Sequence, residues 1–289
     1  MKTFKFTPIL GWSASRYDLF TQCKRQYYYN YYAKYDPEIS EEKIHRLKAM
    51  TSVALETGNI VHDVTKTLLE RLQRNQSGID RGRFLDYTRK VTDEYCQART
   101  FREIYYREIP RLDIDGIFGK VSASLQNFLD SDRFSWLMEK ALQSSRDWII
   151  EPPGYGETRI NGQKAYCKVD FLFPLADRLY IIDWKTGKPN DEKHEKQLRG
   201  YTTWAAYHFD REPGLVTPLI AYLYPRYRER ELAGEDMDIR QFARQIKSES
   251  AQMFRFCKDI KNNIPREKEQ FTMNRTRLCD YCNYLELCR

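Results

Sequence analysis

The chain has 289 residues, of which 41% are hydrophobic, and its 48 Lys and Arg against 41 Asp and Glu give a formal net charge of +7. This composition is sufficient for a sizeable core and excludes a mainly disordered chain. No run reaches the roughly 18 apolar residues of a membrane-spanning helix, and the start has no hydrophobic segment long enough for a secretory signal. We therefore expect a cytoplasmic protein, and the positive charge is compatible with a polyanionic partner without demonstrating one.

The first predicted helix begins near Ser15, which stands three residues before Asp18 in a capping-box-like pair. It runs through Cys23 into a cluster of five tyrosines: Tyr27, Tyr28, Tyr29, Tyr31 and Tyr32. Tyrosines beside a basic groove can stack on bases. They more often wedge a helix against the core with their hydroxyls reaching water, and we expect that role for most of them.

Residues 36–48 are charged and are expected to form a loop that leads into a helix. The next helix is predicted to follow Gly58, with an apolar stripe formed by Val61, Val64, Leu68 and Leu72. His62 lies at the edge of this stripe. A lone histidine in that position is more often structural than catalytic.

A polar loop is expected at 73–83, and residues 84–148 predict several helices that are broken near Pro110 and Gly116. This region carries no recognisable chemical motif. We interpret it as part of a helical insertion that either forms a wall over an active site or serves only as scaffolding.

A sheet is predicted to follow the turn-rich residues 152–156. The Asn161-Gly162 pair is a strong hairpin signal and predicts strands at 157–160 and 164–173 around it.

Residues 168–185 alternate with period two on both sides of a turn at 174–178, which predicts a second hairpin. A symmetric register places Asp170 opposite Asp183, with Cβ atoms roughly 4.5 to 5.5 Å apart. Lys185 follows Asp183 by two residues and so lies on the same sheet face. Two adjacent carboxylates favour a cation between them.

The alternative is a surface hairpin whose acids and lysine are simply solvated. The pair Ile181 and Ile182 argues against it, because this apolar run before Asp183 is typical of a strand buried on both faces. An acid in a buried strand needs a partner or a metal.

Residues 194–209 predict a helix with one face formed by Gln197, Tyr201, Trp204 and His208. A strand at 219–224 is expected to join the Asp183 strand by a right-handed crossover through this helix. The order strand, strand, strand, helix, strand predicts an α/β core, and residues 236–260 predict a long amphipathic helix.

The seven cysteines, in a chain without a secretory signal, favour reduced thiols or metal ligation over a disulfide framework. Cys279, Cys282 and Cys288 lie within ten residues, one ligand short of a four-thiolate site. A fourth ligand must come from elsewhere, and spacing alone does not separate zinc from an iron–sulfur cluster. The remaining cysteines are expected to be buried thiols: Cys96, Cys167 and Cys257.

Five segments in this order resemble the PD-(D/E)XK nuclease superfamily, in particular its RecB-like iron–sulfur members: residues 15–32, 58–62, 170–185, 197–201 and 279–288. The resemblance implies an α/β, restriction-endonuclease-like core with a mixed central sheet flanked by helices. It divides a single nuclease domain, 1–289, into a helical insertion at 36–150, a catalytic core at 151–235 and a C-terminal helix with a cysteine clasp at 236–289. Cys167 stands where the family often has glycine.

The resemblance also implies roles for individual residues. Mg²⁺ or Mn²⁺ would be bound by His62, Asp170, Asp183 and the backbone carbonyl of Trp184. Lys185 would position or deprotonate the attacking water. Supporting roles are implied for Gln197 and Tyr201, which would orient DNA or Lys185, and for Glu157. The three C-terminal cysteines would hold a 4Fe-4S cluster together with Cys23.

The implied activity is metal-dependent DNA cleavage, by an exonuclease that prefers single strands or ends, in repair, recombination or defence. Helicases or CRISPR adaptation proteins are the implied partners, and the chain resembles standalone members because it has no phosphate-binding Gly-x4-Gly-Lys-Ser/Thr loop. Two alternatives are a non-catalytic iron–sulfur module for DNA binding or assembly, and a zinc-stapled enzyme of the same fold, which would lack the brown colour of a cluster.

Overall fold

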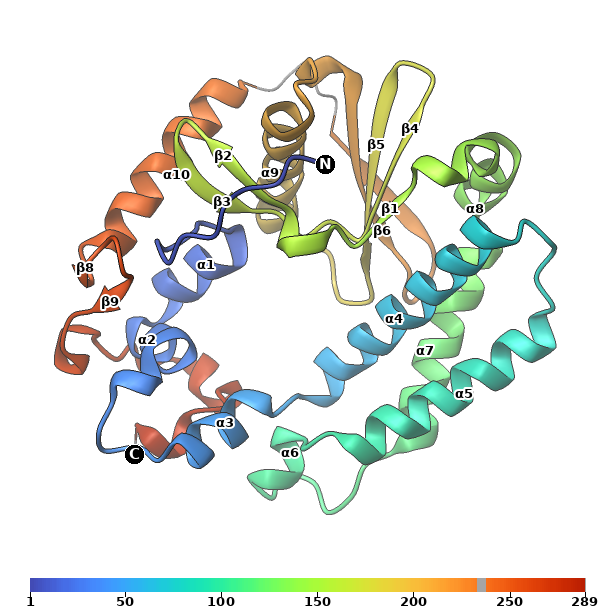
Figure 1. Cartoon of the computed structure of the whole chain (residues 1–289). Helices are drawn as coiled ribbons and strands as arrows, with labels where there is room; N and C mark the ends of the chain where they lie inside the picture. Colours follow the sequence, from blue (N-terminus) through green and yellow to red (C-terminus); the bar gives the residue numbers. More distant parts are fainter. Residues whose placement is uncertain (233–237, 289) are drawn as a thin grey trace. The chain divides into compact units, whose positions relative to one another are not determined.

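The computed structural model describes residues 1–232 and 238–288 (Figure 1). Its contacts form two compact units, each assembled from separate stretches of chain. Among the described residues, the first unit contains 1–51, 157–166 and 238–288, and the second contains 52–156 and 167–232. None of the helices in these residues is long and apolar enough to cross a membrane. Whether 1–289 functions as a single nuclease domain, with the segments given above, stays a prediction.

The second unit contains a five-stranded mixed sheet with the order β1-β4-β5-β6-β7. Its strands are β1 (Ile149–Ile150), β4 (Phe171–Leu175), β5 (Arg178–Lys185), β6 (Val216–Tyr222) and β7 (Arg228–Glu231). β4 and β5 are antiparallel, whereas β5 and β6 are parallel and are connected through helix α9 (Asp191–Phe209). The mixed sheet with flanking helices confirms the predicted α/β class.

The register of the central hairpin agrees with the prediction over its paired residues. Leu172 pairs with Ile181, and Phe171 pairs with Ile182. Asp170 lies one residue before β4 begins, so it flanks the ladder instead of forming a paired position with Asp183. The predicted continuous strand 164–173 is wrong, because one strand ends at Tyr166 and β4 starts at Phe171.

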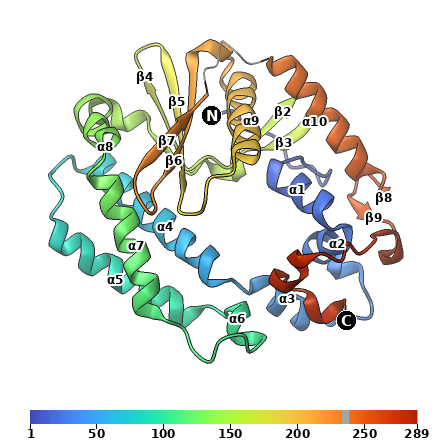
Figure 2. The ribbon, with the colours of Figure 1, turned by 180° about the vertical axis from the view of Figure 1, so that it is seen from behind.

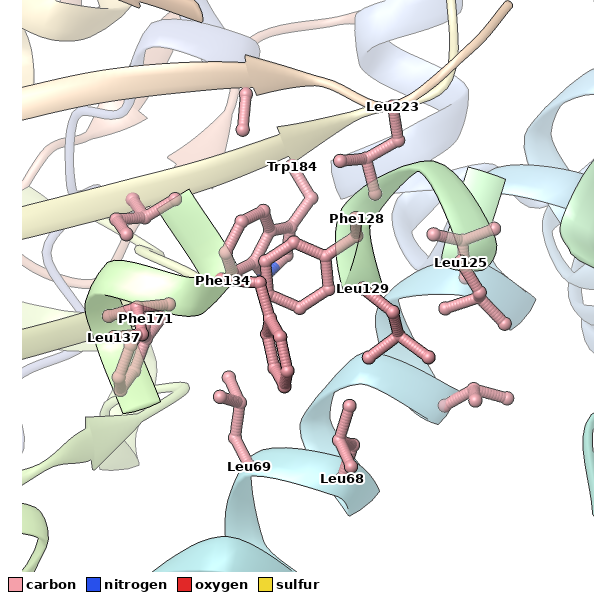
Figure 3. Packing of buried hydrophobic residues seen from close by; sticks show 14 of the residues in the cluster. Leu68, Leu69, Leu125, Phe128, Leu129, Phe134, Leu137, Phe171, Trp184 and Leu223 are labelled. Carbon is pink, nitrogen blue, oxygen red and sulfur yellow. The ribbon is translucent and has the colours of Figure 1, made fainter. Parts of the chain in front are cut away.

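Both faces of the sheet are covered, as expected from the apolar run in β5. On one face, Phe171 and Trp184 pack against helices α4 (Val53–Arg74), α7 (Ile114–Leu129) and α8 (Asp132–Trp136). The Trp184 ring lies 4.7 Å from that of Phe128 in α7 (Figure 3). On the other face, Ile181 packs with Leu198 of α9. Each fully buried side chain of this size contributes about 1.5–3 kcal/mol. This packing fixes the strand on which Asp183 and Lys185 lie.

The helices of the second unit are α4 (Val53–Arg74), α5 (Arg81–Ala98), α6 (Arg102–Tyr105), α7 (Ile114–Leu129) and α8 (Asp132–Trp136), followed by a π turn, η2 (Leu137–Ala141), and a 3₁₀ turn, η3 (Leu142–Asp147). Figure 2 shows α5 and α7 beside α4. The predicted helical region is therefore confirmed, but Gly116 does not break it. Gly116 lies in the first turn of α7, where its N–H donates to the capping side chain of Asp113.

The start of α4 differs from the prediction. Ser52 caps the helix by accepting from the N–H of Leu55, so Gly58 and His62 lie within α4 and not at its start. A Cβ on Gly58 would be 3.3 Å from Oγ1 of Thr186. The glycine thus allows α4 to pass close to the chain that leaves β5.

The first unit combines the N-terminal helices with the C-terminal segment. Its helices are α1 (Ala14–Gln22), α2 (Lys24–Tyr32), α3 (Glu41–Ala49) and α10 (Ile239–Phe254); its two hairpins are β2 (Glu157–Ile160) with β3 (Gln163–Tyr166), and β8 (Cys257–Asp259) with β9 (Ile264–Pro265). The Asn161-Gly162 turn forms with positive φ at both residues. However, β2 and β3 form a sheet of their own and do not join the five-stranded sheet.

Two helix predictions in this unit need correction. Ser13, not Ser15, caps α1, and the helix ends before Cys23, whose extended backbone separates α1 from α2. The predicted helix 236–260 corresponds to α10, which begins after a cap at Asp238 and ends at Phe254; residues 236–237 lie outside the described residues. Residues 257–259 form β8 instead.

The tyrosine cluster is mainly core. Tyr27, Tyr28, Tyr29 and Tyr32 are at most 2% exposed. Phe271 packs among them, with its ring 5.0 Å from that of Tyr28. Tyr31 is half-buried, and the guanidinium of Arg16 lies 4.0 Å from its ring. The expected core role therefore holds for most of these tyrosines.

Candidate active site and cysteine pocket

The residues proposed for catalysis all belong to the second unit. Asp183 and Lys185 lie near the end of β5, and Asp170 directly precedes its partner strand β4. His62 comes from α4, and Gln197 and Tyr201 come from α9. The hairpin and the two helices thus bring together residues that are more than 100 positions apart in the sequence.

Asp170 is held by two contacts. Its Oδ1 lies 3.1 Å from Nδ1 of His62, and its Oδ2 accepts the backbone N–H of Trp184 at 2.9 Å. Burial acts to raise the pKa of Asp170, but the neighbouring His62, Lys185 and the Trp184 N–H outweigh it and lower the pKa. Burial likewise opposes the charge of His62, whereas the Asp170 carboxylate raises its pKa above the usual value. The pair is therefore stabilised in its ionised form.

Asp183 has a different environment at each carboxylate oxygen. Its Oδ1 accepts hydrogen bonds from Gln197 Nε2 at 3.0 Å and from the Tyr201 hydroxyl. Its Oδ2 is buried and forms an ion pair with the ammonium of Lys185. Burial and the negative charge of Asp170 raise the pKa of Asp183, against the opposing effect of Lys185. The two carboxylates therefore repel each other, and added positive charge would relieve that repulsion.

Lys185 stays positively charged within this site. Burial disfavours the ammonium, but Asp183 and Asp170 outweigh burial and raise the pKa of Lys185. Its side chain remains 25% exposed, so the ammonium neutralises the acids while still reaching solvent.

The two acids are each neutralised by a different cationic partner in this arrangement, Asp170 by His62 and Asp183 by Lys185. In the described residues, 1–232 and 238–288, no group of three or more His, Cys, Asp or Glu side chains is arranged to hold a metal ion. The donor chemistry nevertheless suits Mg²⁺ or Mn²⁺, which prefer carboxylate and carbonyl oxygens. Asp183 Oδ2, which faces the Lys185 ammonium here, is the oxygen that a cation would use first.

The face of α9 continues beyond Tyr201 as predicted. The indole N–H of Trp204 donates to the carbonyl of Gly156 at 2.7 Å, and its ring stacks on His208. Glu157, in contrast, belongs to the first unit, where its carboxylate lies 2.8 Å from Arg159 and 3.7 Å from Lys164. These ion pairs give Glu157 a structural role within its own hairpin.

The sequence did not point to Glu151, which follows β1. Its backbone N–H donates to the carbonyl of Asp170 at 3.0 Å. Its φ of +49° is unusual for a residue with a side chain. An isolated acid before two prolines carries no sequence signal for either feature.

The first unit contains a pocket lined by four thiols. Cys23 comes from the break between α1 and α2, and Cys279, Cys282 and Cys288 come from the 3₁₀ turns η8 (Arg277–Tyr281) and η9 (Leu285–Leu287) and the residues beside them. The extended backbone at Cys23 lets its sulfur accept the N–H of Gln26 at 3.5 Å.

The thiols influence one another. Burial raises the pKa of Cys282 to about 11, and the other three pocket cysteines add to the shift. Of the cysteines outside this set, Cys96 and Cys257 are buried as predicted. Cys167 was also predicted to be buried but is half-buried, and it lies in the non-strand segment of the sequence that connects β3 to β4.

Comparison with known proteins identifies a protein family that this sequence matches. A family model described as the PD-(D/E)XK nuclease superfamily matches residues 11–289. Among solved structures, the chain is similar to one titled "Crystal structure of SSO0001", with 18% sequence identity and a TM-score of 0.31; the match covers 64% of this chain and 77% of that one. No curated protein gives a significant match.

Proposed function

Because the chain belongs to the PD-(D/E)XK nuclease superfamily, we propose that it is a metal-dependent deoxyribonuclease. The observation that carries this proposal is the buried pair of acids, Asp170 and Asp183, with Lys185 in contact with Asp183. Burial of two neighbouring carboxylates is costly unless positive charge compensates them. A site that keeps two buried carboxylates close together is therefore suited to bind a cation and, through it, an anionic substrate.

Members of the superfamily typically use Mg²⁺ or Mn²⁺. The ion would be held by Asp170, Asp183, the carbonyl of Trp184 and His62, which would give up its proton to act as a ligand; when bound, the ion would polarise the phosphodiester and activate water. Asp183 Oδ2, which contacts Lys185 here, would contribute to holding the ion. The ammonium of Lys185 would lie beside the site, where it would orient the attacking water or the phosphate.

Gln197 and Tyr201 hold the opposite oxygen of Asp183. Their two hydrogen bonds fix the rotation of the carboxylate, so that Oδ2 stays directed toward Lys185 and the cation. Preorganised polar groups of this kind need no rearrangement during the reaction. We therefore assign Gln197 and Tyr201 positioning roles.

We further propose that the chain is a RecB-like iron–sulfur exonuclease that prefers single-stranded DNA or DNA ends. Cys23, Cys279, Cys282 and Cys288 would hold a 4Fe-4S cluster with a structural role. The fit rests on the donor set, because four thiols line one pocket and a thiolate set of this kind is typical of such clusters. Helicases or CRISPR adaptation proteins are the partners that this assignment suggests.

The activity is tested by purifying the protein with and without oxygen and digesting end-labelled single-stranded and duplex DNA with Mg²⁺ or Mn²⁺. Metal-dependent cleavage by the wild type, lost in Asp183→Ala and retained in the surface variant Asp86→Ala, is the expected result. DNA binding without cleavage under all of these conditions would favour the non-catalytic module. A colourless protein that contains zinc would overturn the cluster but not the nuclease.

A further inference from the structure

Beside the catalytic acids, the second unit contains a charge cluster that the proposed mechanism does not use. Glu151 Oε2 lies 3.4 Å from Nζ of Lys66 and 3.6 Å from Nζ of Lys168. One carboxylate oxygen thus faces two ammonium groups, which leaves a surplus positive charge.

Each member of this cluster is tied to a residue of the candidate site. Lys66 follows His62 by four residues on α4, so the two side chains share a helix face. Lys168 precedes Asp170 by two residues, and the N–H of Glu151 donates to the carbonyl of Asp170. The lysine pair therefore lies on the same elements that place the metal-binding candidates.

The unusual backbone conformation of Glu151 supports a functional role for the cluster. A residue with a side chain rarely adopts a φ of +49°, and such strain persists only where surrounding contacts impose it. Here it places a carboxylate that is only 23% exposed between two lysines that are 34% and 56% exposed. The ammonium groups are thus accessible to a ligand, while the acid that holds them is mostly covered.

We propose that Lys66 and Lys168 bind a backbone phosphate of the DNA strand next to the phosphate that is cleaved, and that Glu151 holds the two ammonium groups in place before the strand arrives. Lysine binds phosphate as a point charge, so this contact carries no base preference. The phosphate takes over the role of Glu151 as counter-ion. This inference rests on the proposed nuclease function, because it names the strand contact of that same site.

The test measures binding of a fluorescent single-stranded oligonucleotide by the full chain, in EDTA, at several salt concentrations. Lys66→Gln and Lys168→Gln are each expected to weaken binding about 3- to 10-fold and to reduce the log–log salt slope. Because both lysines bind one phosphate, the double variant should reduce the slope by about 0.7, the value for one phosphate contact on a single strand. Lys90→Gln, which alters an exposed lysine of α5 paired with Glu94, is the control and should change neither value.

Glu151→Gln gives the discriminating result. Because the phosphate replaces the Glu151 carboxylate as counter-ion, removing that negative charge should make the variant bind DNA more tightly than wild type. A variant that melts earlier and binds DNA no more tightly would show a purely structural cluster and would overturn the inference. Unchanged salt slopes in both lysine variants, or weaker binding by a stably folded Glu151→Gln, would overturn the inference.

The two proposals fail in different ways. Wild-type protein that binds DNA with the expected lysine dependence but cleaves nothing with Mg²⁺ or Mn²⁺ overturns the nuclease and leaves the strand contact standing. If the wild type cleaves DNA in a metal-dependent way, but the Lys66 and Lys168 variants have the same KM and the same salt slope as wild type, the strand contact alone is overturned.

Discussion

The active-site acids and the pocket cysteines are held in place by different means. Asp183 lies on a strand buried on both faces, and its side chain contacts Lys185 of the same strand and two residues of the long helix α9. The pocket cysteines instead lie on short 3₁₀ turns and at a helix break, and all four are half-buried. A packed sheet can keep its geometry without a bound ion, whereas a ligand shared by several short turns would stabilise them. The acids should therefore serve chemistry, and the cysteines stability.

The largest expected effect separates catalysis from folding in the second unit. Asp183→Ala should reduce DNA cleavage by about 10³-fold or more, because it removes an oxygen that we propose binds the metal and leaves Lys185 without its counter-ion. Lys185→Ala should act similarly. Cleavage assays paired with thermal melting check this, and the melting temperatures should remain within a few degrees of wild type. Full activity in either variant would show that the acids do not perform the chemistry.

The second prediction applies the opposite test to the cysteine pocket. Cys282→Ala should bleach the protein, lower its melting temperature and reduce nuclease activity only through misfolding. A clasp between Cys23 and the C-terminal turns closes a very long loop, which contributes on the order of several kcal/mol. Absorption spectra, iron content and calorimetry measure the effect.

Two matched controls accompany this variant. Cys96→Ala and Cys257→Ala remove buried thiols outside the pocket and should leave the colour intact. A Cys282→Ala protein that keeps both its iron and its melting temperature would show that the ligand set is misassigned.

The same contrast explains what the sequence could predict. The central hairpin followed from period-two alternation and its register from a symmetric turn, because both signals are local in the sequence. The start of α4 was missed even though the Ser52 cap is a local signal, because Gly58 was interpreted as preceding the helix; the close approach at Gly58 depends instead on a tertiary contact with Thr186. The independent β2–β3 sheet was missed because its Asn-Gly turn is a local signal, whereas the sheet that a hairpin joins is decided by distant residues.

For the candidate site, the sequence identified the ionisable residues but not their pairing. Spacing placed Asp170 beside Asp183, yet it did not predict that His62 would contact the first acid and Lys185 the second. Glu151 was missed entirely, because its role depends on a left-handed backbone and on lysines from two other segments.

A third, smaller effect sharpens the role of preorganisation in the active site. Tyr201→Phe removes one of the two hydrogen bonds to Asp183 Oδ1 and keeps the buried ring, so cleavage should fall by about 10-fold with little change in stability. The loss should appear in kcat, since Tyr201 is assigned to orient a catalytic group. Steady-state kinetics measure it, with the exposed Tyr155→Phe as control. A change confined to KM would instead indicate a direct DNA contact.

The smallest expected effect concerns a surface ion pair in the second unit, between Arg133 and Glu229, and tests whether its charge contributes to stability. Arg133 on α8 donates to both carboxylate oxygens of Glu229 on β7, at 2.9 and 2.7 Å. Burial opposes ionisation of Glu229, but the bonds from Arg133 and Tyr227 prevail and lower its pKa. A carboxyl with a lowered folded-state pKa contributes stability above its unfolded pKa and loses that contribution as the pH falls through the folded value.

Glu229→Gln should therefore reduce the free energy of unfolding by about 1 kcal/mol at pH 7, a modest value because the pair is partly exposed to solvent. The difference should shrink below about pH 4, whereas the exposed control Glu94→Gln should be nearly neutral throughout. Urea unfolding across this pH range measures both variants, and a loss in Glu229→Gln that does not vary with pH would assign the effect to packing around the side chain instead of its charge.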